Sequence, residues 1–182
     1  LLDATLMDGS RIVMTLGREI STRGSTFTIR RFRDEPFTPV DLLEFKTFSS
    51  MQIAFFWMAM QYGMSMLFVG GTASGKTTSL NACSLFLPWQ HKIVSIEETR
   101  ELNLPHPNWI PGCTRQGFGG EAGGTGMKAP GEVDMYDLLR AALRERPEYI
   151  IVGEIRGAEA YVLFQAMATG HTTYSTFHAD SI

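Results

Sequence analysis

The sequence predicts an α/β fold built on a parallel sheet, preceded by the end of a small α+β domain. Four short apolar runs that we expect to be strands alternate with helical patterns, at residues 65–69, 92–96, 149–152 and 172–177. Strands that alternate with helices pair in parallel through right-handed crossovers. The Tyr149–Val152 run is continuously apolar, as in a central strand covered on both faces. The start of the chain differs, since Arg11–Leu16 and Thr26–Phe32 alternate apolar and polar side chains.

Three helices are expected among these strands, at residues 76–87, 135–146 and 157–169. The helix over 135–146 is the best marked, because Asp134 can cap its first turn and Pro147 stops it. Its apolar residues fall on one helical face: Met135, Leu138, Leu139, Ala142 and Leu143. The Gly/Pro-rich stretch 103–133 shows neither period, so we expect a long loop there, mobile within Gly119–Gly131.

The chain is expected to divide near residue 35. Residues 1–35 would be the C-terminal part of the small domain, residues 36–48 a linker with the first helix, and residues 49–182 the α/β domain. Thr38 marks the start of that first helix, because threonine is a capping residue and a proline and an aspartate follow in the first turn.

Composition excludes several classes of protein. Of 182 residues, 44% are hydrophobic and 19% charged, which is typical of a globular chain and not of a disordered one. Sixteen basic residues against 19 acidic ones give a net charge of −3, which disfavours a protein that binds nucleic acid through its phosphates. The two cysteines, Cys83 and Cys113, form neither a CxxC pair nor a disulfide framework, which favours a reducing, cytoplasmic setting.

One uncharged run resembles a membrane span, since no charged residue occurs from Thr47 to Gly75. However, Gln52 and Gln61 interrupt the run, and it continues directly into a glycine-rich loop. We therefore expect a buried helix over Ser50–Tyr62, followed by a central strand over Ser65–Val69.

The strongest motif is GGTASGKT at residues 70–77, which fits the phosphate-binding pattern G-x-x-x-x-G-K-[ST], follows an apolar strand and opens a helix. Gly70 and Gly75 let the backbone curl so that its N–H groups point at phosphate oxygens, and the helix N-terminus adds positive charge. Lys76 would reach the β- and γ-phosphates, and the Thr77 hydroxyl would ligate Mg²⁺. The predicted nucleotide-binding residues are Gly70, Gly71, Thr72, Ala73, Ser74, Gly75, Lys76, Thr77 and Thr78.

Hydrolysis also needs a carboxylate near the γ-phosphate, and three glutamates follow predicted strands. Glu97 and Glu98 follow one strand and Glu154 ends another. Ligands of open α/β sheets bind at the carboxyl ends of the strands, where a carboxylate can hold a Mg²⁺-bound water or accept a proton from the attacking water. We expect catalytic roles for them, with Thr77 and Glu154 as the Mg²⁺ site. The alternative is that each glutamate caps a helix or is solvated.

Two histidines, His171 and His178, flank the last predicted strand. A metal pair is not expected, because no other residue completes a chelating spacing with them. A contact with phosphate is the functional interpretation, and an ordinary hydrogen-bonded histidine is the alternative.

Three arginines, Arg30, Arg31 and Arg33, end the β-rich segment. From the run alone, the favoured interpretation is a solvated, charged edge strand. The alternative is an arginine that reaches a phosphate held by the α/β domain and neutralises charge in the transition state.

Together these segments resemble the secretion and pilus traffic ATPases, in particular the archaeal pilus, archaellum and secretion members. GGTASGKTTSLN resembles the Walker A motif of the family, and IVSIEETREL its acidic Asp box. The segment LLRAALRERPEYIIVGEIRGAEA resembles the helix and atypical Walker B strand, and TGHTTYSTFHADS the His box. FTIRRFRDEPFTPVDLL resembles the join between the N-terminal domain and the motor domain. The Asp box departs mildly from the family, with Glu at both acidic positions.

The resemblance implies a RecA-like P-loop NTPase motor domain that uses ATP and Mg²⁺, in a homo-hexamer that drives filament assembly or secretion through a membrane platform protein. Such a protein would be cytoplasmic and peripheral at the inner face of the membrane. Carried over by position, Glu154 takes the Walker B role and Glu97 or Glu98 polarises the attacking water. His178 would sense the γ-phosphate with His171 as a weaker partner. Arginines that reach the phosphates from the N-terminal domain would be Arg11 and Arg30.

Two other functions stay open at this stage. One is a P-loop ATPase that translocates or processes DNA, which the acidic balance disfavours. The other is a nucleotide-gated scaffold that does not hydrolyse ATP. The motif positions further imply that the chain begins inside the N-terminal domain and stops just past the His box, so we expect weak activity and poor hexamer formation from these residues alone.

Overall fold

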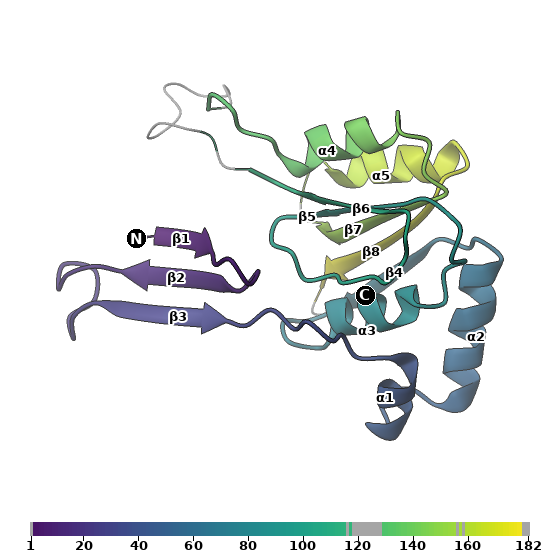
Figure 1. The fold of residues 1–182 in the computed structure, drawn as a ribbon, viewed down its shortest axis with the longest axis horizontal. Coiled ribbons are helices and arrows are strands. Elements are labelled where there is room, and N and C mark those ends of the chain that lie inside the picture. The colour runs from purple at the N-terminus through teal and green to yellow at the C-terminus, as the bar shows by residue number, and fades with distance from the viewer. Residues whose placement is uncertain (1, 116, 118–128, 156, 158, 180–182) are drawn as a thin grey trace.

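A computed structural model describes residues 2–115, 117, 129–155, 157 and 159–179 of the chain, and the described residues form two sheets (Figure 1). The first, here called the small sheet, is antiparallel with the order β1-β2-β3 and comprises β1 (Leu2–Thr5), β2 (Arg11–Thr15) and β3 (Thr26–Arg30). The second is parallel with the order β4-β8-β7-β5-β6. Its strands are β4 (Met66–Gly70), β5 (Ile93–Glu97), β6 (Trp109–Cys113), β7 (Tyr149–Ile155) and β8 (Thr172–His178). The predicted α/β class is confirmed.

Helices cover both faces of the parallel sheet and leave the small sheet projecting to one side (Figure 1). The helices are α1 (Pro39–Glu44), α2 (Ser50–Gln61), α3 (Lys76–Ser84), α4 (Met135–Ala142) and α5 (Glu159–Ala168). On one face, Ile150 and Val152 of β7 pack against α4 and α5. On the other face, Ile151 packs with residues of α2 and α3. Because alternate residues of β7 enter two cores, a continuous apolar run is what this central strand needs.

Polar caps define where three helices begin. Thr38, Ser49 and Asp134 each accept a hydrogen bond from a backbone N–H in the first turn, and in each case the N3 side chain bonds back to the cap. The predicted caps of α1 and α4 are therefore confirmed. These contacts satisfy N–H groups that lack helical partners, so each start is specified locally.

Two strands differ from the prediction. β1 has no counterpart in the expected pattern, and β6 lies inside the 103–133 stretch that we expected to be a loop. The sequence pattern does not predict β6 because Pro111 and Gly112 are both unfavourable inside a central strand. β6 is the last strand in the sheet order, and an edge strand tolerates proline. Most of the glycine-rich segment expected to be mobile lies outside the described residues.

The uncharged run also differs in part. It forms α2 and β4 as expected, but β4 is an edge strand of the described sheet and not a central one. α2 is only half buried: Met51, Phe55, Trp57 and Met58 are 82%, 61%, 55% and 61% exposed. A helix that is apolar all round can pack only one side against a sheet, so its outer side stays exposed in this chain. Among the described residues, no helix has the length and apolar character needed to cross a membrane.

Candidate active site

A cavity of about 730 Å³ lies where the carboxyl ends of the parallel strands face the small sheet. Nearly all predicted site residues line it, and they come from both sheets. They are Arg11, Arg30, Thr72, Ala73, Ser74, Gly75, Lys76, Thr77, Thr78, Glu97, Glu98, Glu154 and His178. Gly70 and Gly71 do not line it but form the start of the loop that does. The structure therefore brings into one cavity residues that are far apart in the sequence.

The phosphate loop connects β4 to α3 and has the left-handed backbone that the motif requires. Gly75 has φ 83° and Ala73 has φ 58°. A Cβ atom on Gly70 would lie 2.8 Å from Ser74 Oγ, so a side chain there would force the Ser74 side chain to move. Lys76 Nζ donates to the Gly71 carbonyl at 2.7 Å, which folds the lysine back along the loop. The lysine amine thus lies beside the backbone N–H groups of the loop, and both would bind the same phosphates.

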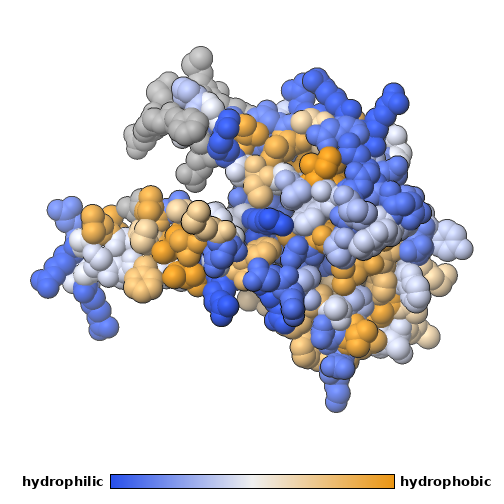
Figure 2. Space-filling model, in the orientation of Figure 1, coloured by the Kyte–Doolittle hydropathy of each residue, from blue (hydrophilic) through white to orange (hydrophobic). Residues whose placement is uncertain are grey.

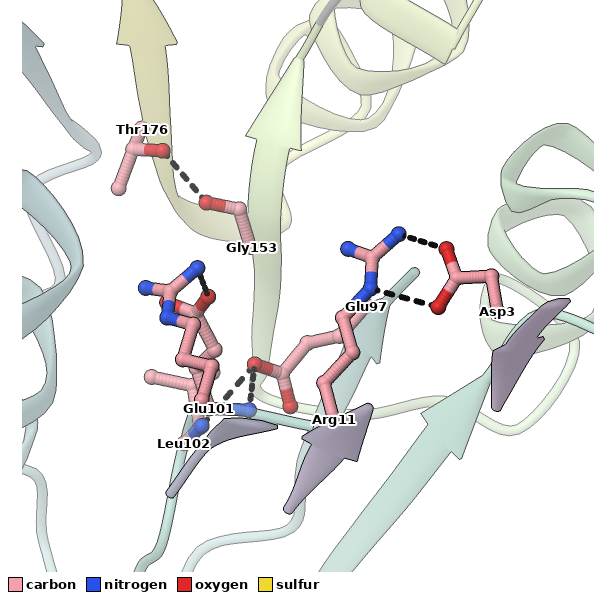
Figure 3. Close-up of polar contacts among 8 residues, drawn as sticks. Asp3, Arg11, Glu97, Glu101, Leu102, Gly153 and Thr176 are labelled. Atoms are coloured by element: carbon pink, nitrogen blue, oxygen red, sulfur yellow. Dashed lines mark hydrogen bonds and ion pairs between the residues drawn. The ribbon is translucent and has the colours of Figure 1, made fainter. Parts of the chain in front are cut away.

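Glu97, at the end of β5, is only 2% exposed. Its Oε1 accepts two backbone hydrogen bonds, from Glu101 at 2.9 Å and from Leu102 at 3.0 Å (Figure 3). Its Oε2 is buried without a hydrogen-bond partner in the described part of the chain. Burial raises the pKa of Glu97 to about 7, although the two N–H donors act in the opposite direction. A carboxyl group with such a pKa can both accept and release a proton near neutral pH.

The other two glutamates differ from Glu97 in their surroundings. Glu98 is exposed, while Glu154 is half buried within β7. The pairing register of β7 with β8 shifts between Val152 and Ile155, as in a β-bulge, and Glu154 lies within this stretch. Thr176 Oγ1 donates to the Gly153 carbonyl at 2.5 Å and so fixes the bulge to β8 (Figure 3). Bulges re-aim side chains, and this one directs Glu154 to the cavity.

The two histidines lie at opposite ends of β8. His178 pairs in register with Gly70, the first residue of the phosphate loop, and lines the cavity. His171 precedes β8 at its other end, within 3.3 Å of Thr169 Oγ1. Six strand residues, each contributing about 3.3 Å, lie between the two histidines. The expectation that His171 assists at the phosphate is therefore wrong for this chain, because a strand places its two ends far apart.

Arg11 and Arg30 are cross-strand neighbours on β2 and β3. Arg11 forms a bidentate ion pair with Asp3 of β1 (Figure 3). Arg30 Nη1 lies 2.8 Å from Glu101 Oε1. Arg33 lies instead over the Phe37 ring, 3.8 Å from its centre. β3 is an exposed edge strand, as the first interpretation of the arginine run expects, and Arg30 also lines the cavity, so a contact with phosphate stays a prediction.

Sequence reasoning missed two residues that organise the cavity. Glu101 belongs to the acidic segment after β5, but only the fold shows that it faces Arg30. Thr176 lies in an ordinary strand pattern and carries no signal of its contact with Gly153.

A family model and individual relatives of this chain indicate the same protein family. Residues 3–182 match the family model described as "Type II/IV secretion system protein". The uncharacterised protein MJ0900 of Methanocaldococcus jannaschii is 47% identical over 184 residues, which covers 100% of this chain and 31% of that protein. The type IV secretion system protein PtlH of Bordetella pertussis is 39% identical over 132 residues, covering 70% of this chain and 36% of that protein. The chain thus spans about a third of the length of these relatives.

Solved structures share the fold. The VirB11 ATPase of the Brucella suis type IV secretion system, in complex with sulphate, has a TM-score of 0.59 at 26% identity, over 99% of this chain and 58% of that one. The pilus retraction motor PilT with bound ADP has a TM-score of 0.63 at 23% identity, over 98% of this chain and 47% of that one, which supports the fold alone. Because the family match extends over nearly the whole sequence and the fold agrees with it, this chain belongs to the secretion and pilus traffic ATPases.

Proposed function

We propose that this chain is the nucleotide-hydrolysing part of an ATPase motor that drives pilus or archaellum assembly or protein secretion. The observation that carries the proposal is one cavity that combines a phosphate loop and a buried acid from the parallel sheet with two arginines from the small sheet. A nucleotide-gated scaffold needs the loop, whereas the buried Glu97 carboxyl and the two arginines in the same cavity are groups that hydrolysis would use.

The phosphate loop would bind the β- and γ-phosphates of ATP. Its backbone N–H groups and the N-terminus of α3 provide fixed partial positive charge, and Lys76 provides a full one. On binding, Lys76 Nζ would exchange the Gly71 carbonyl for phosphate oxygens, which form stronger, charge-assisted hydrogen bonds.

The oxygen donors at the cavity fit Mg²⁺ bound together with phosphate. No group of three His, Cys, Asp or Glu residues in the described ranges could hold a metal ion. Mg²⁺ suits such a site, since it keeps several waters and uses one or two protein oxygens plus substrate phosphates. Thr77 and Glu154 would hold it, Glu154 through water, and the ion would supply charge neutralisation at the phosphates.

For hydrolysis we propose Glu97 as the proton acceptor, with Glu98 closer to solvent. Glu97 Oε1 is committed to two N–H donors, while Oε2 has no partner among the described residues and can accept a proton from the attacking water. His178 beside the loop would contact the γ-phosphate. Arg11 and Arg30 would neutralise charge in the transition state.

As a whole protein, we propose a homo-hexamer peripheral to the cytoplasmic face of a membrane, bound to an integral platform protein. In it, residues 1–35 would belong to an N-terminal domain, residues 36–48 to a linker, and residues 49–182 to the motor domain. ATP binding would draw the two arginines and the phosphate loop together, and hydrolysis would release them. The resulting domain motion would act on the platform.

The test is ATP turnover by the full-length protein, with its size in solution measured with and without nucleotide. Lys76→Ala should abolish steady phosphate release, while Lys92→Ala, which removes a lysine outside the cavity, should leave it intact. Absence of turnover in a full-length hexamer would contradict the proposal. Strong stimulation by DNA would favour the DNA-translocating alternative, despite the net charge of −3.

A further inference from the structure

Glu101 occupies the contact between the two sheets and has no role in the proposed hydrolysis. We infer that Glu101 is a positioning residue: it holds the Arg30 guanidinium beside the phosphate loop while no nucleotide is bound, and Arg30 leaves it for the terminal phosphate of ATP. The inference rests on the proposed function. It adds a binding partner that Arg30 has before nucleotide binds, and it predicts that breaking this ion pair changes the affinity for ATP.

The backbone of Glu101 is fixed to the parallel sheet. Its N–H donates to Glu97 Oε1 at 2.9 Å, and the N–H of Leu102 donates to the same oxygen at 3.0 Å. Glu97 ends β5, which is buried along its whole length. Residue 101 therefore has a defined position relative to the phosphate loop, whatever the small sheet does.

The side chain of Glu101 reaches across to the small sheet. Its Oε1 lies 2.8 Å from Arg30 Nη1, and both residues line the cavity that the phosphate loop also lines. Arg11 differs, because its partner Asp3 lies on the neighbouring strand of the same sheet. Arg30 is thus tied to the parallel sheet, whereas Arg11 is tied within the small one.

Two further contacts attach the exit of the small sheet to the same segment. Asn103 Nδ2 donates to the carbonyl of Asp34 at 2.7 Å, and the Arg100 guanidinium lies 5.6 Å from the centre of the Phe32 ring. Two residues of the segment after β5, Arg100 and Asn103, therefore contact Phe32 and Asp34 of the segment after β3. These contacts keep Arg30 near the cavity when its ion pair breaks.

The ion pair is weak enough to be exchanged. The Arg30 side chain is 70% exposed and that of Glu101 is 30% exposed, and pairs so open to water contribute little. A terminal phosphate carries more charge than a carboxylate and accepts two guanidinium N–H groups at once, so it competes well for the arginine. Arginine stays charged throughout, so the exchange needs no proton transfer.

The test compares two nucleotides on the full-length protein: ADP and an ATP analogue that cannot be hydrolysed. In Glu101→Gln, the weakened pair competes less for Arg30, so affinity for the analogue should rise about two- to fivefold. Affinity for ADP, which lacks the γ-phosphate, should stay unchanged. In an Arg30→Ala background, Glu101→Gln should no longer affect the analogue.

Glu145→Gln is the matched control, because Glu145 pairs with Lys92 at 3.8 Å outside the cavity and should leave both affinities unchanged. Equal changes for both nucleotides, or the same change with Arg30 absent, would mean that Glu101 is only structural and would overturn the inference. If the unmodified protein binds neither nucleotide, the proposed function fails as well. Normal binding with no effect of Glu101→Gln overturns the positioning role alone.

Discussion

The two sheets that share the cavity differ sharply in how they are held. All five residues of β5 are buried and two apolar cores cover the parallel sheet, whereas all five residues of β3 are exposed. Figure 2 shows the small sheet as an arm with apolar side chains on its open surface. Its contacts to the parallel sheet described above are polar or cation–π. The difference implies a cavity with one rigid wall and one wall that can move.

The chemistry is divided between these walls in the same way. The phosphate loop and the glutamates lie on the rigid sheet, where catalytic geometry must be kept within a fraction of an ångström. The arginines lie on the weakly held sheet, where a small shift moves a full positive charge toward or away from phosphate. Under the proposed function, this arrangement would let ATP binding alter the position of the small sheet without disturbing the acid groups.

The largest effect expected is on turnover when the rigid wall loses the acid proposed for the Walker B role. Glu154→Gln should reduce kcat about 10²- to 10⁴-fold, because the neutral amide lacks the negative charge that would hold the Mg²⁺-bound water. Steady-state phosphate release measures it, with Glu145→Gln as the control. A drop smaller than about tenfold would contradict the assigned role, since it would lie within the range of indirect effects.

Replacing an isoleucine by alanine should lower the free energy of unfolding more in the parallel sheet than in the small sheet. Ile151 on β7 is 0% exposed and Ile29 on β3 is 44% exposed. Ile151→Ala should lower the free energy of unfolding by about 2–5 kcal/mol through a core cavity. Ile29→Ala should lower it by about 0.5 kcal/mol or less. Urea unfolding measures both, and equal losses would show that the small sheet is packed as tightly as the parallel one.

Part of this contrast could be predicted from the sequence. The phosphate loop, the central position of β7 and the caps Thr38 and Asp134 follow from local patterns, because each depends on residues close in the chain. The edge position of β4 does not follow, since an apolar run of five residues suits either place. The choice between Glu97 and Glu98 also needs the fold, because only the fold shows that the buried strand β5 ends at Glu97 and that Glu98 after it is exposed.

The free energy of unfolding should depend on pH with opposite signs for the acidic groups of the two walls. Burial raises the pKa of Glu97 from 4.5 to about 7, whereas the Arg11 hydrogen bond lowers the pKa of Asp3 on the small sheet. The contribution of Glu97 to the free energy of unfolding is therefore fully present below about pH 4.5 and is lost as the pH rises through about 7. The loss should reach about 3 kcal/mol at most, at about 1.4 kcal/mol per pKa unit.

Glu97→Gln tests this sign, because the amide oxygen can still accept the N–H groups of Glu101 and Leu102. The free energy of unfolding, measured from pH 4 to pH 8, should decline less in the variant than in the unmodified protein. The same slope in both proteins would mean that Glu97 titrates normally and that its burial is relieved by water.

The smallest effect expected separates two buried threonines within the rigid sheet itself. Thr176 and Thr173 both lie on β8, at 1% and 0% exposure. Thr176 Oγ1 donates to the Gly153 carbonyl, whereas Thr173 Oγ1 has no hydrogen-bond partner in the described part of the chain. Valine replaces only the hydroxyl, so Thr176→Val should cost about 1 kcal/mol, while Thr173→Val should be neutral or slightly stabilising. Because the Thr176 contact holds the bulge that directs Glu154, only Thr176→Val should also lower kcat with the nucleotide affinity unchanged. Equal kinetics in the two variants would show that the bulge holds its shape without this hydrogen bond.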